Sequence, residues 1–201
     1  GGAGYIGTIL IPQLLNAGHE VILFDIFMFG PDPILSFCHH PNLTIIAGDV
    51  RDLNALRAAN DGCDAAVHLA AIVGSPACAK DEELARTTNV IGTENILRVL
   101  NPDQKLIFAS TGSTYGKVTD ICTEESPINP LTLYGETKAE GENITVKEGA
   151  VGLRFATVFG LSPRLRLDLM VNDFIYRAIH EKSLVVYESW FRRTFLHARD
   201  A

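Results

Sequence analysis

Seven residues at the start of the chain, Gly1-Gly2-Ala3-Gly4-Tyr5-Ile6-Gly7, decide which fold the sequence favours. Gly1, Gly4 and Gly7 form a GxxGxxG pattern, a spacing variant of the glycine fingerprint for dinucleotides. Glycines at these positions allow a tight turn, a close approach of the backbone to a pyrophosphate, and close packing of a helix on a sheet. We expect that helix to begin near Tyr5, so that its positive end meets the phosphates.

An acidic residue follows the fingerprint at the spacing that a dinucleotide site requires. Asp25 ends the strand-like run Glu20–Asp25, 18 residues after Gly7. A carboxylate there is placed to accept the hydroxyls of an adenosine ribose and repels a 2′-phosphate, and the following Ile26–Phe29 contains no arginine. These features predict NAD rather than NADP. Asp49, after the next strand-like run, either contacts the adenine or simply forms a turn.

Apolar runs alternate with helix-like segments along most of the chain. The expected strands are Glu20–Asp25, Leu43–Ala47, Ala65–Leu69, Lys105–Ala109 and Val151–Arg154. The expected helices are Tyr5–Ala17, Leu53–Ala59, Glu82–Leu100 and Gly135–Lys147, with Asp52 and Asp81 as caps. This order predicts an α/β fold with a Rossmann-type doubly wound parallel sheet.

The alternation of strand-like runs and helix-like segments changes after Gly160, and this change suggests two domains. We expect residues 1–160 to form the NAD-binding domain, with its first strand lying before Gly1, because the fingerprint normally follows a strand. Residues 161–201 are expected to begin a small carboxyl-terminal substrate lobe. In that lobe we expect a helix at Leu169–His180 and short strands at Leu184–Tyr187 and Thr194–His197.

The composition excludes several classes of protein. The chain has 201 residues, 47% of them hydrophobic and 20% charged, and a net charge of −7, which argues against disorder and against generic binding to nucleic acid or anionic membranes. No apolar run approaches the roughly 20 residues of a membrane span. The four cysteines lack CxxC or zinc-ligand spacing, so we expect reduced, packed thiols, no metal site and a cytoplasmic location.

A tyrosine and a lysine are spaced for acid–base chemistry. Tyr134 and Lys138 are four residues apart, so on a helix their side chains share one face. An ammonium there is expected to stabilise the phenolate and to lower the pKa of Tyr134. Thr111 and Ser113 lie in a hydroxyl-rich loop after the strand Lys105–Ala109, where Rossmann ligands lie. The competing interpretations are a solvated helix face and an ordinary loop.

A series of segments in order makes the chain similar to the extended short-chain dehydrogenases/reductases, in particular their nucleotide-sugar epimerase/dehydratase branch. The segments run from the glycine loop to the end of the chain: GGAGYIG, Asp25, Gly48–Val50, His68–Ala71, Asn89–Thr93, the STGSTYG loop, Pro130–Lys138, Leu153–Phe155 with Val158–Gly160, and Arg193–His197. The resemblance therefore covers essentially the whole chain.

The resemblance implies roles for individual residues. Thr111, Tyr134 and Lys138 would be the catalytic set. The implied cofactor contacts are Gly1, Gly4, Tyr5, Ile6, Asp25, Asp49, Val50, Leu69, Ala70, Ala71, Asn89 and Lys138. Ser113, Thr157 and Arg193 are the expected substrate contacts, although Arg193 is equally consistent with a surface arginine. Arg164 and Arg166 are candidates for phosphate binding or for a solvated surface.

Departures from the family pattern narrow the function. The dehydratases carry an Asp-Glu pair after the catalytic threonine, whereas Gly112 and Ser113 stand here, and Ala156-Thr157 replaces a common sugar-contacting asparagine. We therefore expect an NAD-dependent nucleotide-sugar epimerase that acts at C4 through a 4-keto intermediate. A nucleotide-sugar 4-ketoreductase and a non-catalytic dinucleotide sensor are the alternatives. We also expect a homodimer.

Overall fold

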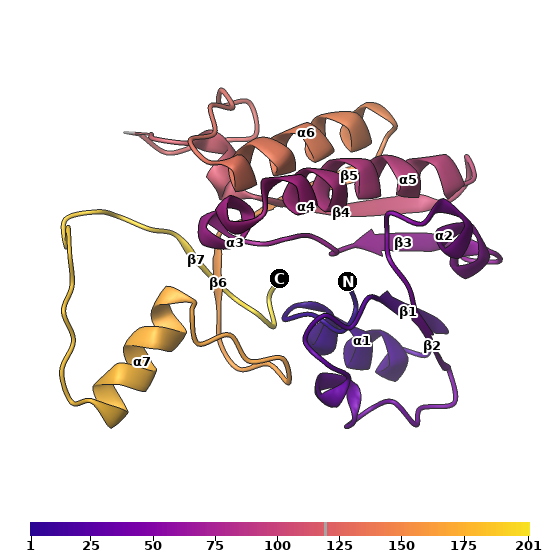
Figure 1. Ribbon diagram of the computed structural model, residues 1–201, viewed down its shortest axis with the longest axis horizontal. Helices are drawn as coiled ribbons and strands as arrows, with labels where there is room; N and C mark the ends of the chain where they lie inside the picture. Colours follow the sequence, from indigo (N-terminus) through magenta and orange to yellow (C-terminus); the bar gives the residue numbers. More distant parts are fainter. Residues whose placement is uncertain (119) are drawn as a thin grey trace.

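The strands of the protein are parallel wherever they pair (Figure 1). The computed structural model describes residues 1–118 and 120–201. Strand β1 (Val21–Asp25) pairs with β2 (Leu43–Ala47), and β4 (Lys105–Thr111) lies between β3 (Ala65–His68) and β5 (Val151–Phe155). A third pair joins β6 (Thr157–Phe159) to β7 (Phe195–His197). The predicted strand positions are confirmed within two residues for β1 to β5.

Helices connect these parallel strands. They are α1 (Gly7–Asn16), α2 (Leu53–Asn60), α3 (Ser75–Lys80), α4 (Glu82–Arg86), α5 (Gly92–Val99), α6 (Leu133–Lys147) and α7 (Met170–His180). Both predicted caps form: the Asp52 carboxylate accepts from the amides of Asn54 and Ala55, and Asp81 accepts from that of Leu84. Short 3-10 turns occupy Asp32–Ile34 and Gly112–Tyr115.

The helices pack against the strands and bury part of their apolar side chains, whereas Ile22, Ile45, Val67 and Val151 remain exposed. Figure 1 shows α4, α5 and α6 running together along the β3–β4–β5 group, with α1 beside β1 and β2. One buried cluster joins α1 to β1 through Ile11, Leu15 and Leu23, and a second joins Leu56, Ile96 and Leu106. This is the Rossmann-type doubly wound architecture that the alternating pattern predicted.

Two sequence predictions are wrong in detail. The expected helix Glu82–Leu100 contains a π-helical segment, Thr87–Ile91, between α4 and α5. The expected strand Leu184–Tyr187 has no regular structure: Val185 and Tyr187 are exposed, and no neighbouring strand pairs with them among the described residues. A strand-like composition forms a strand only where a partner edge is available.

Two elements of the structure, α3 and β6, were not predicted from the sequence. Helix α3 carries Pro76 in its first turn, where a missing N–H costs no helical hydrogen bond, so this proline was a usable signal. Strand β6 has only three residues and is defined by its pairing with β7. The strand expected before Gly1 stays a prediction. Among residues 1–118 and 120–201, no helix has both the length and the apolar character to span a membrane.

Candidate active site

The glycine loop is packed so tightly that side chains are excluded from it. A Cβ on Gly7 would lie 2.4 Å from the carbonyl oxygen of Gly2, and one on Gly1 would lie 2.4 Å from the backbone nitrogen of Ala70. Ile6 is the N-cap of α1, so the helix begins at Gly7, two residues later than predicted. The first amides of α1 point out of its amino end, as an anion site requires.

The Tyr5 side chain joins the glycine loop to the carboxyl-terminal segment. Its hydroxyl donates to the carbonyl of Gly160 at 2.5 Å and accepts from Asn172 Nδ2 at 3.2 Å. The hydroxyl of Ser162 donates to the Tyr5 carbonyl at 2.8 Å. Any contact of Tyr5 with a pyrophosphate is therefore left to its backbone.

Asp25 stands at the carboxyl end of β1, beside the glycine loop. Its Oδ2 accepts from the amide of Ala3 at 3.0 Å, and its Oδ1 accepts from the amide of Phe27 at 2.8 Å. Phe27 has a φ of +55°, a left-handed conformation that is costly for a side-chain-bearing residue and that accompanies this tight turn. Both carboxylate oxygens retain lone pairs for further donors.

An arginine reaches the loop after β1 from a distant segment. The guanidinium of Arg164 lies 3.9 Å from the centre of the Phe29 ring and donates to the carbonyl of Leu165. The sequence argument for NAD rested partly on the absence of an arginine in Ile26–Phe29. Because Arg164 packs against this loop in the folded protein, that part of the argument no longer holds. The preference for NAD therefore depends on Asp25.

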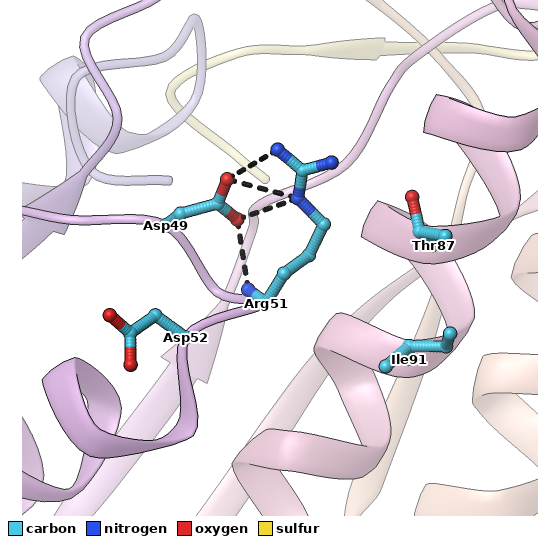
Figure 2. A pocket seen from close by; sticks show the side chains of 5 residues that line it. All are labelled: Asp49, Arg51, Asp52, Thr87 and Ile91. Atoms are coloured by element: carbon cyan, nitrogen blue, oxygen red, sulfur yellow. Dashed lines mark hydrogen bonds and ion pairs between the residues drawn. The ribbon is translucent and has the colours of Figure 1, made fainter.

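The Asp49 carboxylate is paired with the neighbouring Arg51 at the rim of an open hollow of about 430 Å³. Figure 2 shows the guanidinium of Arg51 folded back onto the Asp49 carboxylate, with Nη2 2.5 Å from Oδ2, while Thr87 and Ile91 face them across the hollow. This pairing holds the pKa of Asp49 below its usual value. Val50 packs its side chain into the core.

The structure brings the three predicted catalytic residues together. Thr111 ends β4, and its side chain lies close enough to the hydroxyl of Tyr134, near the start of α6, to act on the pKa of that tyrosine. Thr132 caps this helix by accepting from the amide of Gly135 at 3.1 Å. Lys138 follows one turn after Tyr134 and is buried, with only 3% of its surface exposed. The spacing argument for a shared helix face thus holds.

The expected lowering of the Tyr134 pKa is wrong for this structure. Burial raises the pKa of Tyr134, and it outweighs the opposing effects of the Thr111 hydrogen bond and of the Arg166 charge. The Lys138 ammonium lies 4.0 Å from the centre of the Phe108 ring instead. Burial also lowers the pKa of Lys138, to about 7, although Glu142 acts in the opposite direction.

This lysine makes stability depend on pH. The unfolded chain holds the Lys138 proton up to about pH 10.4, whereas the folded protein releases it near pH 7. The unfolded state therefore binds more protons between these values, so the free energy of unfolding rises with pH across this range. The gain is lost again as the pH falls back to about 7.

We expect the free energy of unfolding to rise with pH between 7 and 10 by up to about 1.4 kcal/mol per unit from Lys138. Urea unfolding at pH 7, 8 and 9 measures it, and Lys138→Met should flatten the slope. Lys147→Met, at an exposed position of the same helix, is the control. Equal slopes for the two variants would contradict the assignment.

Asn89 is buried and its amide is fully engaged within the protein. Its Oδ1 accepts from the amide of Ile72 at 2.7 Å, and its Nδ2 donates to the Ile72 carbonyl and to the hydroxyl of Thr137. The π-helical segment places this side chain between the loop after β3 and α6. Asn89 therefore supports the helix that carries Tyr134 and Lys138.

The remaining predicted residues lie around this centre. Leu69, Ala70 and Ala71 follow β3, Gly4 precedes α1, and Ser113 is exposed in the turn after Thr111. Thr157 lies in β6, where its amide donates to the carbonyl of Thr194, next to the exposed Arg193. Arg166 lies close enough to Tyr134 to act on its pKa, and it is paired with Asp168 at 2.5 Å.

Two residues beneath the site escaped the sequence prediction. Glu142 and Arg154 form an ion pair at 2.6 Å, and both side chains are largely buried. Glu142 follows Lys138 at the same four-residue spacing that links Lys138 to Tyr134, so this spacing was an available signal. Asn172, which holds Gly160 and the Tyr5 hydroxyl, carried no such signal.

Comparisons with known proteins agree with this geometry. The chain is 35% identical over 155 residues to UDP-glucose 4-epimerase 2 of Oryza sativa subsp. japonica. The aligned region covers 72% of this chain and 38% of the relative. It is 31% identical over 207 residues to UDP-glucuronate 4-epimerase 6 of Arabidopsis thaliana. This aligned region covers 94% of this chain and 45% of the relative. The chain thus spans about half or less of the length of these relatives.

Solved structures share the fold. UDP-glucuronic acid 4-epimerase from Bacillus cereus, in complex with UDP-glucuronic acid and NAD, superposes with a TM-score of 0.85 and 29% identity over 98% of this chain and 67% of that structure. The model of the NAD dependent epimerase/dehydratase family matches residues 1–201. This chain therefore belongs to the NAD dependent epimerase/dehydratase family.

Proposed function

We propose that this chain carries the cofactor-binding and catalytic parts of an NAD-dependent nucleotide-sugar epimerase that acts at C4. The observation that carries the proposal is the grouping of Thr111 and the Tyr134 hydroxyl, with Lys138 one turn away, at the carboxyl end of β4. Ligands of parallel α/β sheets bind outside the carboxyl ends of the strands.

The residues around the glycine loop fit a dinucleotide. Gly1 and Gly7 lack side chains and so let the glycine loop pack closely against Ala70 and the start of α1, and Asp25 has lone pairs for ribose hydroxyls. Bound NAD would supply the hydride acceptor and donor. The names of the relatives, which include enzymes for UDP-glucose and UDP-glucuronate, support a UDP-sugar as substrate.

The roles of the chain's own residues follow from their positions. Tyr134, as the phenolate, accepts the proton of the C4 hydroxyl while that carbon becomes a ketone, and it returns the proton when the hydroxyl is restored on the other face. Thr111, whose hydroxyl lies near that of Tyr134, orients the reacting oxygen. Lys138 favours the phenolate when it carries its proton and binds the ribose of the cofactor.

The division into residues 1–160 and 161–201, and the homodimer, are part of the same proposal. The pairing of β6 with β7 and the hydrogen bonds from Ser162 and Asn172 to Tyr5 join the two parts closely. This supports a substrate lobe that is built directly onto the cofactor loop. Arg193 in this lobe, together with Thr157 and Ser113 in the cofactor-binding part, are the proposed substrate contacts.

The proposal is tested with the full-length protein, NAD, and UDP-glucose or UDP-glucuronate as substrate. We expect nuclear magnetic resonance to show the C4 epimer forming without net accumulation of NADH, and mass spectrometry to find NAD in the purified protein. Tyr134→Phe is the inactive control. A protein that makes no epimer but oxidises reduced cofactor with a 4-keto sugar nucleotide would be the ketoreductase instead.

A further inference from the structure

A buried ion pair lies one helical turn beyond the proposed catalytic lysine. The Glu142 side chain is 8% exposed, and its Oε1 accepts from Arg154 Nε at 2.8 Å and from Nη2 at 2.6 Å. Its other oxygen accepts from the hydroxyl of Ser110. A carboxylate removed from water in this way is tolerated only when such partners replace its hydration.

The partners of Glu142 surround the catalytic threonine. Ser110 directly precedes Thr111 in β4, so its hydroxyl ties the end of this strand to α6. Arg154, in the adjacent β5, also donates to the hydroxyl of Tyr115 at 2.9 Å and to the carbonyl of Glu124 at 3.0 Å. Tyr115 ends the 3-10 turn that follows Thr111. The network therefore holds Thr111 from both sides.

Glu142 is also the anionic side chain that acts on Lys138. The ammonium lies on the fully buried Phe108 ring, and the imidazole of His68 packs at 5.6 Å on that ring from β3. His68 is neutral: burial and the Lys138 charge hold its pKa well below the usual value. Tyr134, on the same helix, and Arg166, from the loop before α7, complete the ionisable surroundings.

The charge of Glu142 thus opposes the burial of Lys138. Burial favours the neutral amine, while the carboxylate one turn away favours the ammonium and raises the pKa of Lys138. The same side chain therefore acts on two members of the catalytic set, Lys138 through its charge and Thr111 through Ser110.

We propose that Glu142, held by Arg154, is a positioning residue that keeps Lys138 protonated beside Tyr134 and fixes the Thr111 end of β4 against the Tyr134 hydroxyl. This inference rests on the function proposed above for Tyr134 and Lys138. It assigns Glu142 no contact with substrate or cofactor.

The test is Glu142→Gln in the full-length protein, which keeps the shape and removes the charge. The lysine Cε resonances, followed by nuclear magnetic resonance as the pH is changed without sugar nucleotide, report the titration midpoint of Lys138. We expect this midpoint to fall by about one pH unit, a tenfold change in protonation. The alkaline limb of the kcat profile should move by the same amount, with KM changed less than about twofold because Glu142 does not touch the substrate.

Glu140→Gln, at an exposed position of the same helix, is the matched control and should change neither quantity. Glu142→Asp retains the charge and should restore most of the Lys138 midpoint. Ser110→Ala tests the anchoring of Thr111 and should lower kcat roughly 3- to 10-fold, the range for one lost hydrogen bond. It also serves if Glu142→Gln fails to fold.

An unchanged Lys138 midpoint in folded Glu142→Gln, or an unchanged kcat in Ser110→Ala, would overturn the inference. Neither result would affect the proposed function, because the Lys138 midpoint is measured without turnover and a Ser110→Ala variant with unchanged kcat is still an active enzyme. The proposed function fails separately, if Tyr134→Phe keeps its activity.

Discussion

Tyr134→Phe should lower turnover by about 10²- to 10⁴-fold, the usual contribution of a positioned general acid or base. The phenolic oxygen lies near Thr111 and is the group that we propose exchanges a proton with the C4 hydroxyl. Lys138→Ala should do similar damage and should also weaken NAD binding. Tyr176→Phe, on the surface of α7, is the control and should keep normal turnover.

The two residues are expected to act as one unit. The double variant Tyr134→Phe/Lys138→Ala should lose far less activity than the product of the two single losses, because residues that act together are non-additive. Thr111→Ala should cost less than either, since a neutral hydrogen bond contributes about 0.5–1.5 kcal/mol. Steady-state kinetics of the four proteins measure the coupling, and effects that simply multiply would show independent roles.

The protein should bind NAD at least about 100-fold more tightly than NADP, as measured by titration calorimetry. A 2′-phosphate would meet the Asp25 carboxylate, which the amides of Ala3 and Phe27 hold in place. The factor corresponds to about 2.7 kcal/mol, within the range of Coulomb energies between water and a protein surface. Equal or tighter binding of NADP would contradict the prediction.

Two variants locate the source of this preference. Asp25→Asn should weaken NAD about tenfold and reduce the preference, because the amide is uncharged and cannot accept all the same hydrogen bonds. Asp32→Asn, an exposed residue in the same connection, should have no effect. Arg164→Ala removes the cation that stacks on Phe29, and any residual affinity for NADP should fall in this variant.

Local sequence signals predicted most of the secondary structure. Strand β2 was predicted with its observed bounds, and α2 and α6 within one or two residues at each end. Such segments depend on neighbouring residues: a continuous apolar run, a capping aspartate such as Asp52, and a helical period. The Tyr134–Lys138 pair was predictable for the same reason, since four-residue spacing on a helix is a local property.

Features that depend on distant parts of the chain were not predictable in this way. Arg154 meets Glu142 only because β5 lies beside β4 and beneath α6, and Arg164 reaches Phe29 from more than 130 positions away in the sequence. The exposed run Leu184–Tyr187 has a strand's composition but no partner edge among the described residues.

The sequence by itself determined the parallel α/β fold, the glycine loop and the shared helix face of Tyr134 and Lys138, because these follow from local sterics, hydrophobic period and spacing. Only the tertiary structure decided the charge states of that pair. Lys138 is buried against Phe108 and Tyr134 is partly buried, so burial raises the pKa of Tyr134 and lowers that of Lys138. Burial is a property of the whole packed chain, and no local pattern specifies it.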